Sequence, residues 1–258
     1  MYNISLPINK FSVDGIKTAY KERYFDGRDI NLGTSENPIS LQFKRLSDGK
    51  VFYEKSVQLN TFLFNGSCIL TPYAISDTEL GINEIRYDSL NADALLLKLE
   101  ENKMYDLDAT KSLFSSVDLK SKYIIIFYTS YMYKYSHLYS DGIPSKEFWD
   151  KQQNRPYFTK EAAQWIVELN IAKCFIIDNV SFEGNDGAKD YFPVTTTLMN
   201  VDENNKTFVP LIYHANISNK IYKISQNNKL FCRIELGNTP KGIIPGYSVR
   251  INLFTSNL

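Results

Sequence analysis

Residues 123–128 read Tyr-Ile-Ile-Ile-Phe-Tyr, a continuous apolar run that predicts a β-strand buried on both faces. Residues 159–169 read Thr-Lys-Glu-Ala-Ala-Gln-Trp-Ile-Val-Glu-Leu, with Thr159 in the N-cap position and apolar residues at helical spacing behind it. Residues 172–178, Ala-Lys-Cys-Phe-Ile-Ile-Asp, predict the next strand. A strand, a helix and a strand in this order predict a βαβ crossover between two parallel strands. This unit decides the fold class.

The segments on either side of this unit are mostly extended. Turn signals recur through the first fifty residues, for example Ser-Asp-Gly at 47–49, and they predict hairpins. Asp108 is a capping residue that predicts a short helix over 108–114. Further strands are predicted over residues 51–53, 58–64, 92–99, 229–236 and 248–254. We therefore expect a single mixed α/β domain over residues 1–258, rich in β-structure and with flanking helices.

The charge balance excludes some classes of partner. The chain has 258 residues, of which 43% are hydrophobic, and its 29 Lys and Arg residues equal its 29 Asp and Glu residues in number. A general nucleic-acid or anionic-membrane binder needs an excess of positive charge, so neither partner is expected. The first residues lack the pattern of a secretory signal, and no apolar run reaches 18 residues. We expect a cytoplasmic protein.

Histidine and cysteine are scarce. The two histidines, His137 and His214, exclude any site that needs three imidazoles. The three cysteines, Cys68, Cys174 and Cys232, are too far apart for a zinc knuckle and are expected to be reduced, mostly buried thiols.

Four segments resemble the cyclase family that includes bacterial kynurenine formamidase and isatin hydrolase. Thr129-Ser130-Tyr131 resembles the family's T-G-W, and residues 155–166 resemble its P-x-L-S-x-E-A-A-x-W-L helix start. Residues 175–181 resemble its G-I-D-T-x-S strand end, and residues 246–250 resemble its closing G-S-P-V-R. The resemblance implies the swivelling β/β/α architecture of that family and a homodimer.

The family's defining motif, H-x-G-T-H-x-D-x-P-x-H, supplies ligands to one or two divalent cations, usually zinc or manganese. Residues 64–74 read Phe-Asn-Gly-Ser-Cys-Ile-Leu-Thr-Pro-Tyr-Ala in the same register. The side chains of Phe64, Leu70 and Ala74 have no lone pair to offer a cation, and only Cys68 could ligate one. A catalytic zinc needs about three protein ligands, so we expect no metal cofactor. By the same resemblance, the family's downstream His and Glu fall near residues 211–223, with Lys220 or Lys223 at the Glu position.

Three residues are candidates for catalysis. Cys68 is a covalent nucleophile or a buried structural cysteine, and His214 is a general base or a histidine that is simply hydrogen-bonded. Asn65 is a donor to a carbonyl oxygen or a turn residue. Asp178, at the end of a predicted parallel strand, belongs to a ligand site or binds backbone amides.

The remaining candidates would line a pocket. They are Phe64, Ser67, Leu70, Tyr73 and Ala74 from the motif and Tyr131, Tyr133 and His137 from the loop after residue 128, although that loop could equally be a solvent-exposed aromatic segment. The resemblance favours a metal-independent enzyme of secondary metabolism that binds a small apolar or cyclic molecule and promotes its cyclisation, isomerisation or hydrolysis. The alternative is a non-catalytic module that binds a ligand or a partner protein.

Overall fold

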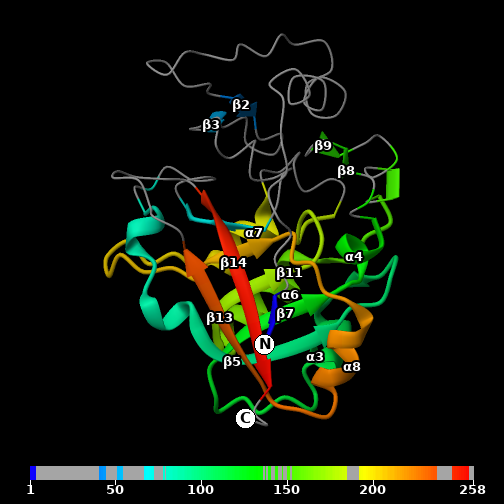
Figure 1. Ribbon diagram of the computed structural model, residues 1–258. Coiled ribbons are helices and arrows are strands. Elements are labelled where there is room, and N and C mark those ends of the chain that lie inside the picture. Colours follow the sequence, from blue (N-terminus) through cyan, green and yellow to red (C-terminus); the bar gives the residue numbers. More distant parts are fainter. Residues whose placement is uncertain are drawn as a thin grey trace.

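A computed structural model gives the fold (Figure 1). It describes residues 1–3, 41–44, 51–54, 67–72, 78, 80–135, 137, 139–140, 143–144, 147, 150–151, 153–184, 192–236 and 246–255. The strand predicted over 58–64 lies outside these residues.

One large sheet organises the described residues. Its strand order is β1-β14-β13-β5-β7-β11-β12-β4. The centre is parallel and consists of β5 (Asn91–Lys98), β7 (Tyr123–Tyr128), β11 (Ala172–Ile177) and β12 (Leu211–Tyr213). The pairing of β7 with β11 confirms the predicted parallel crossover.

The sheet curls round and closes on itself. Antiparallel strands β1 (Tyr2–Asn3), β4 (Cys68–Leu70), β13 (Leu230–Leu236) and β14 (Gly246–Thr255) complete it. Strand β14 pairs with β13 along its length, and it also pairs with β1 near Asn252 and with β4 near Tyr247. Because β4 is also hydrogen-bonded to β12, the strands from β14 round to β4 form a closed ring.

Three helices cover the outside of the parallel strands. Helix α6 (Lys160–Glu168) has the predicted N-cap, because the Thr159 hydroxyl accepts a hydrogen bond from the Ala162 N–H at 3.2 Å. Helix α3 (Leu107–Leu113) is capped by Asp106 rather than by Asp108, with the Asp106 carboxylate 2.9 Å from the N–H of Ala109. Helix α7 (Pro193–Met199) was not predicted, because its three consecutive threonines are poor helix formers, although its proline suits a first helical position.

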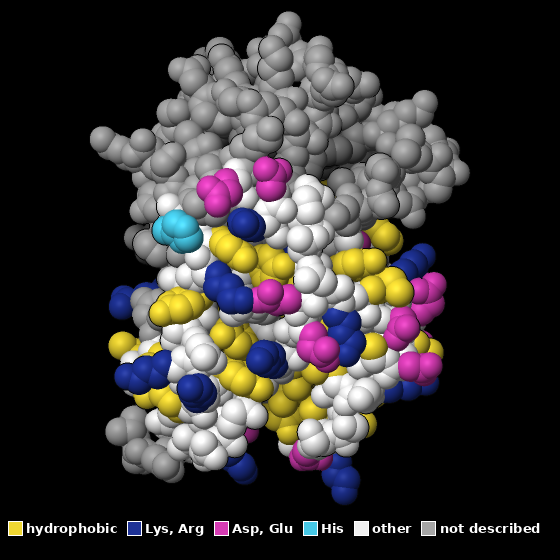
Figure 2. Space-filling model, turned by 90° about the vertical axis from the view of Figure 1, so that its right-hand side faces the viewer, with side chains coloured by type: hydrophobic (Ala, Val, Ile, Leu, Met, Phe, Trp, Pro, Cys, Tyr) yellow, Lys and Arg dark blue, Asp and Glu magenta, His cyan; other side chains and the backbone are white. Residues whose placement is uncertain are grey.

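Two further short helices depart from the prediction of irregular or extended chain. Helix α4 (Tyr131–Tyr135) follows β7 directly, in the segment expected to be a polar loop. Helix α8 (Asn219–Ser225) begins after Ser218, whose hydroxyl accepts a hydrogen bond from the N–H of Ile221. Both lie on the side of the molecule that Figure 2 presents, where Lys and Arg side chains are interspersed with Asp and Glu.

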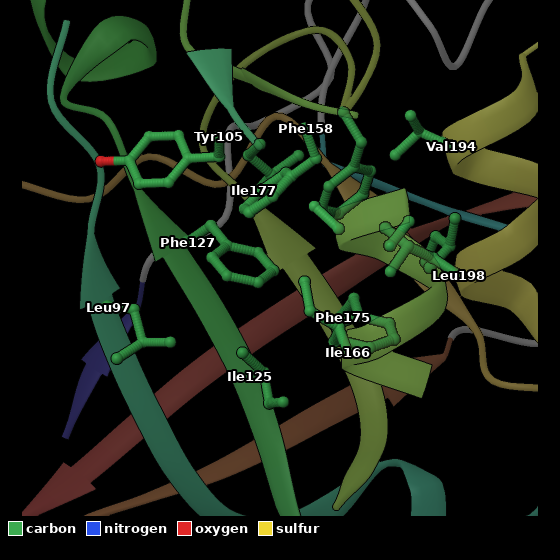
Figure 3. Packing of buried hydrophobic residues seen from close by; sticks show 14 of the residues in the cluster. Leu97, Tyr105, Ile125, Phe127, Phe158, Ile166, Phe175, Ile177, Val194 and Leu198 are labelled. Atoms are coloured by element: carbon green, nitrogen blue, oxygen red, sulfur yellow. The ribbon is translucent and has the colours of Figure 1, made fainter. Parts of the chain in front are cut away.

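The two faces of the sheet belong to two separate cores. Alternation along β7 directs Ile125 and Phe127 to the outer core under the helices, and Ile124 and Ile126 to the inner core within the ring. In the outer core, the ring of Phe127 packs against the rings of Phe158 and Phe175, and Val194 and Leu198 of α7 belong to the same cluster (Figure 3). Since β7 is buried on both faces, its continuous apolar run is explained.

The remaining elements are short and lie outside the large sheet. Strands β2 (Leu41–Lys44) and β3 (Val51–Glu54) pair antiparallel, as expected for a hairpin, and the Ser-Asp-Gly segment between them lies outside the described residues. Two short pairs join β6 (Met104–Tyr105) to β10 (Tyr157–Phe158) and β8 (Tyr139–Ser140) to β9 (Ile143–Pro144). Single 3-10 turns span Ile82–Glu84 and Tyr87–Ser89. Among the described residues, no helix is long and apolar enough to cross a membrane.

Candidate functional site

The described part of the motif segment lies where the parallel strands end. In the β4–β12 pair, Cys68 is opposite Tyr213 and Leu70 is opposite Leu211. The hydroxyl of Ser67 donates a hydrogen bond to the main-chain oxygen of His214 at 2.8 Å. The structure thus brings three predicted site residues together, namely Ser67, Cys68 and His214, whereas Leu70 lies at the other end of the strand pair.

His214 turns the chain at the carboxyl end of β12. Its φ of 61° is in the left-handed region, which is uncommon for a residue other than glycine. The side chain is fully buried, and the main-chain N–H donates to the oxygen of Asn179 at 3.2 Å. The ends of β11, β12 and β4 are therefore connected by hydrogen bonds through His214.

The Cys68 thiol is enclosed in the outer core. Burial raises the pKa of this thiol to about 12, an effect only partly offset by a hydrogen bond with the backbone of Tyr213. Because the thiolate is the nucleophilic form of cysteine, Cys68 is protonated and unreactive at neutral pH in this arrangement. Cys174 and Cys232 are also free and buried, and burial raises the pKa of each.

A buried polar network adjoins Cys68, and none of its members was predicted as a site residue. The hydroxyls of Thr195 and Tyr213 are 3.0 Å apart, and the Thr195 N–H donates to the Glu183 carboxylate at 2.6 Å. The guanidinium of Arg155 donates to the main-chain oxygen of Glu183 at 2.8 Å. Burial raises the pKa of both Glu183 and Tyr213. No local pattern reveals this network, because it joins α7, β12 and the segment after β11.

Asp178 connects the ends of two parallel strands. Its carboxylate accepts hydrogen bonds from the Thr129 N–H at 2.5 Å, the Thr129 hydroxyl at 2.6 Å and the Ser130 N–H at 2.7 Å. Its main-chain oxygen accepts from the N–H of Met132, within α4. Burial outweighs these favourable contacts and raises the pKa of Asp178 to about 7. In the structure, Asp178 takes the second of its two expected roles, that of binding backbone amides.

The other predicted pocket residues are dispersed. Tyr131 is buried, and its hydroxyl donates to the Asn154 oxygen at 2.6 Å, while burial raises its pKa to about 12. Tyr133 is 55% exposed, and His137 is also exposed. Phe64, Asn65, Tyr73 and Ala74 lie outside the described residues.

The donor set at β4 does not fit the divalent cation of the resembled family. Cys68 and Leu70 share the outer core with Leu211 and Tyr213, which pair with them across β12. Within the described ranges, no three His, Cys, Asp or Glu residues are grouped so that they could hold a metal ion. Burying charged metal ligands among such apolar side chains would cost free energy unless a bound cation neutralised their charge. Tyr213 is the residue directly across from Cys68, and Lys220 and Lys223 both lie in α8.

Comparisons with known proteins agree with the motif resemblance. A family model described as "Putative cyclase" matches residues 5–184. A structure described as a potential metal-dependent hydrolase with cyclase activity is similar over 100% of this chain and 98% of its own, with 12% identity and a TM-score of 0.53.

Two isatin hydrolase structures are also similar. One, bound to the product analogue thioisatinate, has 9% identity and a TM-score of 0.56, with 97% of this chain and 88% of that chain covered. The other, isatin hydrolase A from Ralstonia solanacearum, has 11% identity and a TM-score of 0.51, with 96% and 90% covered. At these identities the likeness establishes the fold. No functionally curated protein matches the sequence.

Proposed function

Because this chain belongs to the cyclase family, we propose that it binds a small apolar or cyclic molecule where β4 meets the carboxyl ends of the parallel strands. The protein would promote the cyclisation, isomerisation or hydrolysis of this molecule without a divalent cation. The observation that carries the proposal is the hydrogen bond from Ser67 to His214. It connects the family's motif segment to the carboxyl ends of parallel strands, which is where sheets of this class usually bind ligands.

The chemistry of the donor set supports metal independence. In metal-dependent hydrolases, a bound cation acidifies a water molecule and polarises the substrate carbonyl. Leu70 replaces a carboxylate of the motif, and it packs in the outer core instead of offering an oxygen. The remaining sulfur of Cys68 is one donor where about three are needed.

Orientation and hydrogen bonding would then supply the rate enhancement. Holding a reactive molecule in one conformation can lower a barrier by several kcal/mol, about 7–11 in the best intramolecular cases. His214 and Asn65 remain the candidates for proton transfer and for contact with a carbonyl oxygen, and Phe64, Tyr73, Ala74, Tyr131, Tyr133 and His137 remain candidates for the pocket wall.

One observation favours a second function, that of a non-catalytic binding module. The raised pKa of Cys68, about 12, leaves the strongest nucleophile of the motif protonated at neutral pH. The Ser67 hydroxyl is likewise engaged with a main-chain oxygen. A protein that binds and does not turn over its ligand is compatible with both arrangements.

Two measurements test metal independence and distinguish the enzyme from the binding module. Metal content of the purified full chain is measured by mass spectrometry, and we expect far less than one equivalent of zinc or manganese. Stoichiometric metal that protects the protein against thermal unfolding would contradict metal independence. Thermal shift and absorbance assays with isatin, aromatic amides and lactones then test binding and turnover, before and after treatment with a chelator.

Variants assign any activity that is found. Turnover that survives the chelator and is lost in His214→Ala supports the enzyme, whereas binding without turnover supports the module. A Ser89→Ala variant serves as the matched control, because Ser89 is buried in the 3-10 turn 87–89, outside the site. The family resemblance also predicts a homodimer, which light scattering in solution would test.

A further inference from the structure

The side chain of Asn179 holds a buried hydrogen-bond donor for which the described part of the chain offers no acceptor. The residue lies two positions after the end of β11 and is 0% exposed. Its side-chain oxygen accepts a hydrogen bond from the Ser181 N–H at 2.9 Å. Its side-chain nitrogen, Nδ2, is enclosed and has no hydrogen-bond partner among the residues that the structure describes.

The assignment of nitrogen and oxygen in this amide follows from the contacts. Exchanging the two atoms would place an NH₂ group against the N–H of Ser181, so that two donors would face each other. The unpaired atom is therefore the donor. A buried donor without an acceptor costs about 1–3 kcal/mol, and native proteins keep few such groups.

The position of Asn179 makes this donor relevant to the proposed site. The main-chain oxygen of Asn179 accepts from the N–H of His214, and the main-chain oxygen of His214 accepts from the hydroxyl of Ser67. Asn179 is thus connected by hydrogen bonds to Ser67, at the start of β4, through one intervening residue, His214. Oδ1 of Asn216, two residues beyond His214 in the chain, is another enclosed polar atom with no partner within the described ranges.

We propose that the Asn179 side-chain amide binds a carbonyl or carboxylate oxygen of the molecule that this site receives. The inference rests on the proposed function and identifies the polar end of its ligand. An amide N–H is a neutral donor, and a hydrogen bond formed away from water is strengthened by the low dielectric. A ligand oxygen at Nδ2 would remove the cost of the unpaired donor and fix which end of an otherwise apolar molecule enters first.

The burial of Asn179 has a kinetic consequence. Because its side chain has no exposed surface, the ligand reaches it only during a local opening of the structure. Association is then slower than the rate constants of about 10⁵–10⁷ M⁻¹s⁻¹ that are typical of binding without conformational change.

Nuclear magnetic resonance of the ¹⁵N-labelled full chain tests the contact directly. The side-chain NH₂ signals of Asn179 are assigned by their loss in Asn179→Asp, which retains an oxygen for the N–H of Ser181. Isatin, acetamide and acetate are titrated as oxygen-bearing probes, and indole is the bicyclic control without a carbonyl group. We expect at least one oxygen-bearing probe to shift the Asn179 NH₂ signals and indole to leave them unchanged.

Two results would overturn the inference, and only the second of them would also contradict the proposed function. If a probe shifts the main-chain signals of Ser67 and Cys68 but not the Asn179 side chain, the contact is wrong while the proposed site stands. If no probe shifts any signal at β4 or at the ends of β11 and β12, the proposed function fails together with the inference.

Affinity measurements provide an independent check. Asn179→Asp should weaken binding of the responsive probe at least about fivefold, because it replaces a neutral donor with a carboxylate that only accepts and that repels the probe's oxygen. Thr110→Val is the matched control, because the Thr110 hydroxyl is also buried and unpaired but lies in α3. Equal affinity of Asn179→Asp and the wild type would overturn the contact.

Discussion

The hydroxyl of Ser67 is 2.8 Å from the main-chain oxygen of His214, although 147 positions separate the two residues. The main-chain oxygen of Ser67 also accepts a hydrogen bond, from the N–H of Val249 at 3.0 Å. Ser67 therefore holds the start of β4 against both β12 and β14, at the point where the ring of strands closes.

Replacing Ser67 should weaken this closure. Ser67→Ala removes the donor and leaves a buried carbonyl oxygen with one fewer partner, so the free energy of unfolding should fall by about 1–2 kcal/mol. Ser67→Thr keeps a hydroxyl and should lose less. Urea denaturation measures both, with Ser89→Ala as the control for removing a buried serine hydroxyl. A loss in Ser67→Ala no larger than that in Ser89→Ala would show that the bond contributes nothing.

The chemical reactivity of Cys68 should be low in the folded protein. Its pKa of about 12 means that few molecules carry a thiolate at pH 7.5, and the side chain is also inaccessible. We expect iodoacetamide to leave Cys68 unmodified in native protein and to label it fully after denaturation, as peptide mass spectrometry would record. Rapid native labelling at Cys68 would contradict the enclosed thiol.

The pair formed by Thr195 and Tyr213 should be energetically coupled. Tyr213→Phe and Thr195→Val each remove one side of a buried hydrogen bond, and each should destabilise the protein by about 1–2 kcal/mol. The double variant should lose less than the sum, with a coupling energy of at least about 0.5 kcal/mol in a double-mutant cycle. Strict additivity would mean that the two hydroxyls do not interact.

Asp178 should give the protein a distinct pH dependence. Its pKa is about 7 in the folded state, above the value of about 3.9 in an unfolded chain. Between these values the folded state binds more protons than the unfolded state. The contribution of Asp178 to stability is therefore present below about pH 4 and is lost as the pH rises to 7, with a slope of at most about 1.4 kcal/mol per unit.

The matched comparison for Asp178 is Asp178→Asn. This variant cannot ionise, so its free energy of unfolding, measured in urea at pH 5 and pH 8, should fall less over this interval than that of the wild type. The variant also places an NH₂ group near the donors of Thr129 and Ser130, so a constant offset in stability is expected. Parallel pH profiles for the two proteins would show that Asp178 has no raised pKa.

The sequence predicted the elements whose signals are local. Strand β7, helix α6 and strand β11 are each marked by an apolar run or by a cap with helical spacing, and all three lie where they were expected. Helix α7 was missed because its Thr195-Thr196-Thr197 run has low intrinsic helix propensity, and packing of Val194 and Leu198 in the outer core compensates.

The site could be predicted only in part, for a related reason. The register of the motif singled out Ser67 and Cys68 as candidates, the downstream resemblance singled out His214, and the structure brings these three residues together. Tyr213, Glu183 and Asn179 were not singled out, because their importance depends on which strand ends meet across the ring. Partners so far apart in sequence leave no periodic pattern in one chain.

The closing role of β14 has a consequence for biosynthesis. When the ribosome has completed β13, all four parallel strands of the large sheet have been synthesised, and β12 can already pair with β4. The nascent chain still lacks β14, which pairs with the other edge of β4. Contacts that span so many intervening residues form slowly. Until residues 246–255 emerge from the exit tunnel, β4 retains an unpaired edge, and such edges invite association with neighbouring chains. The proposed binding site would then be completed only late in translation.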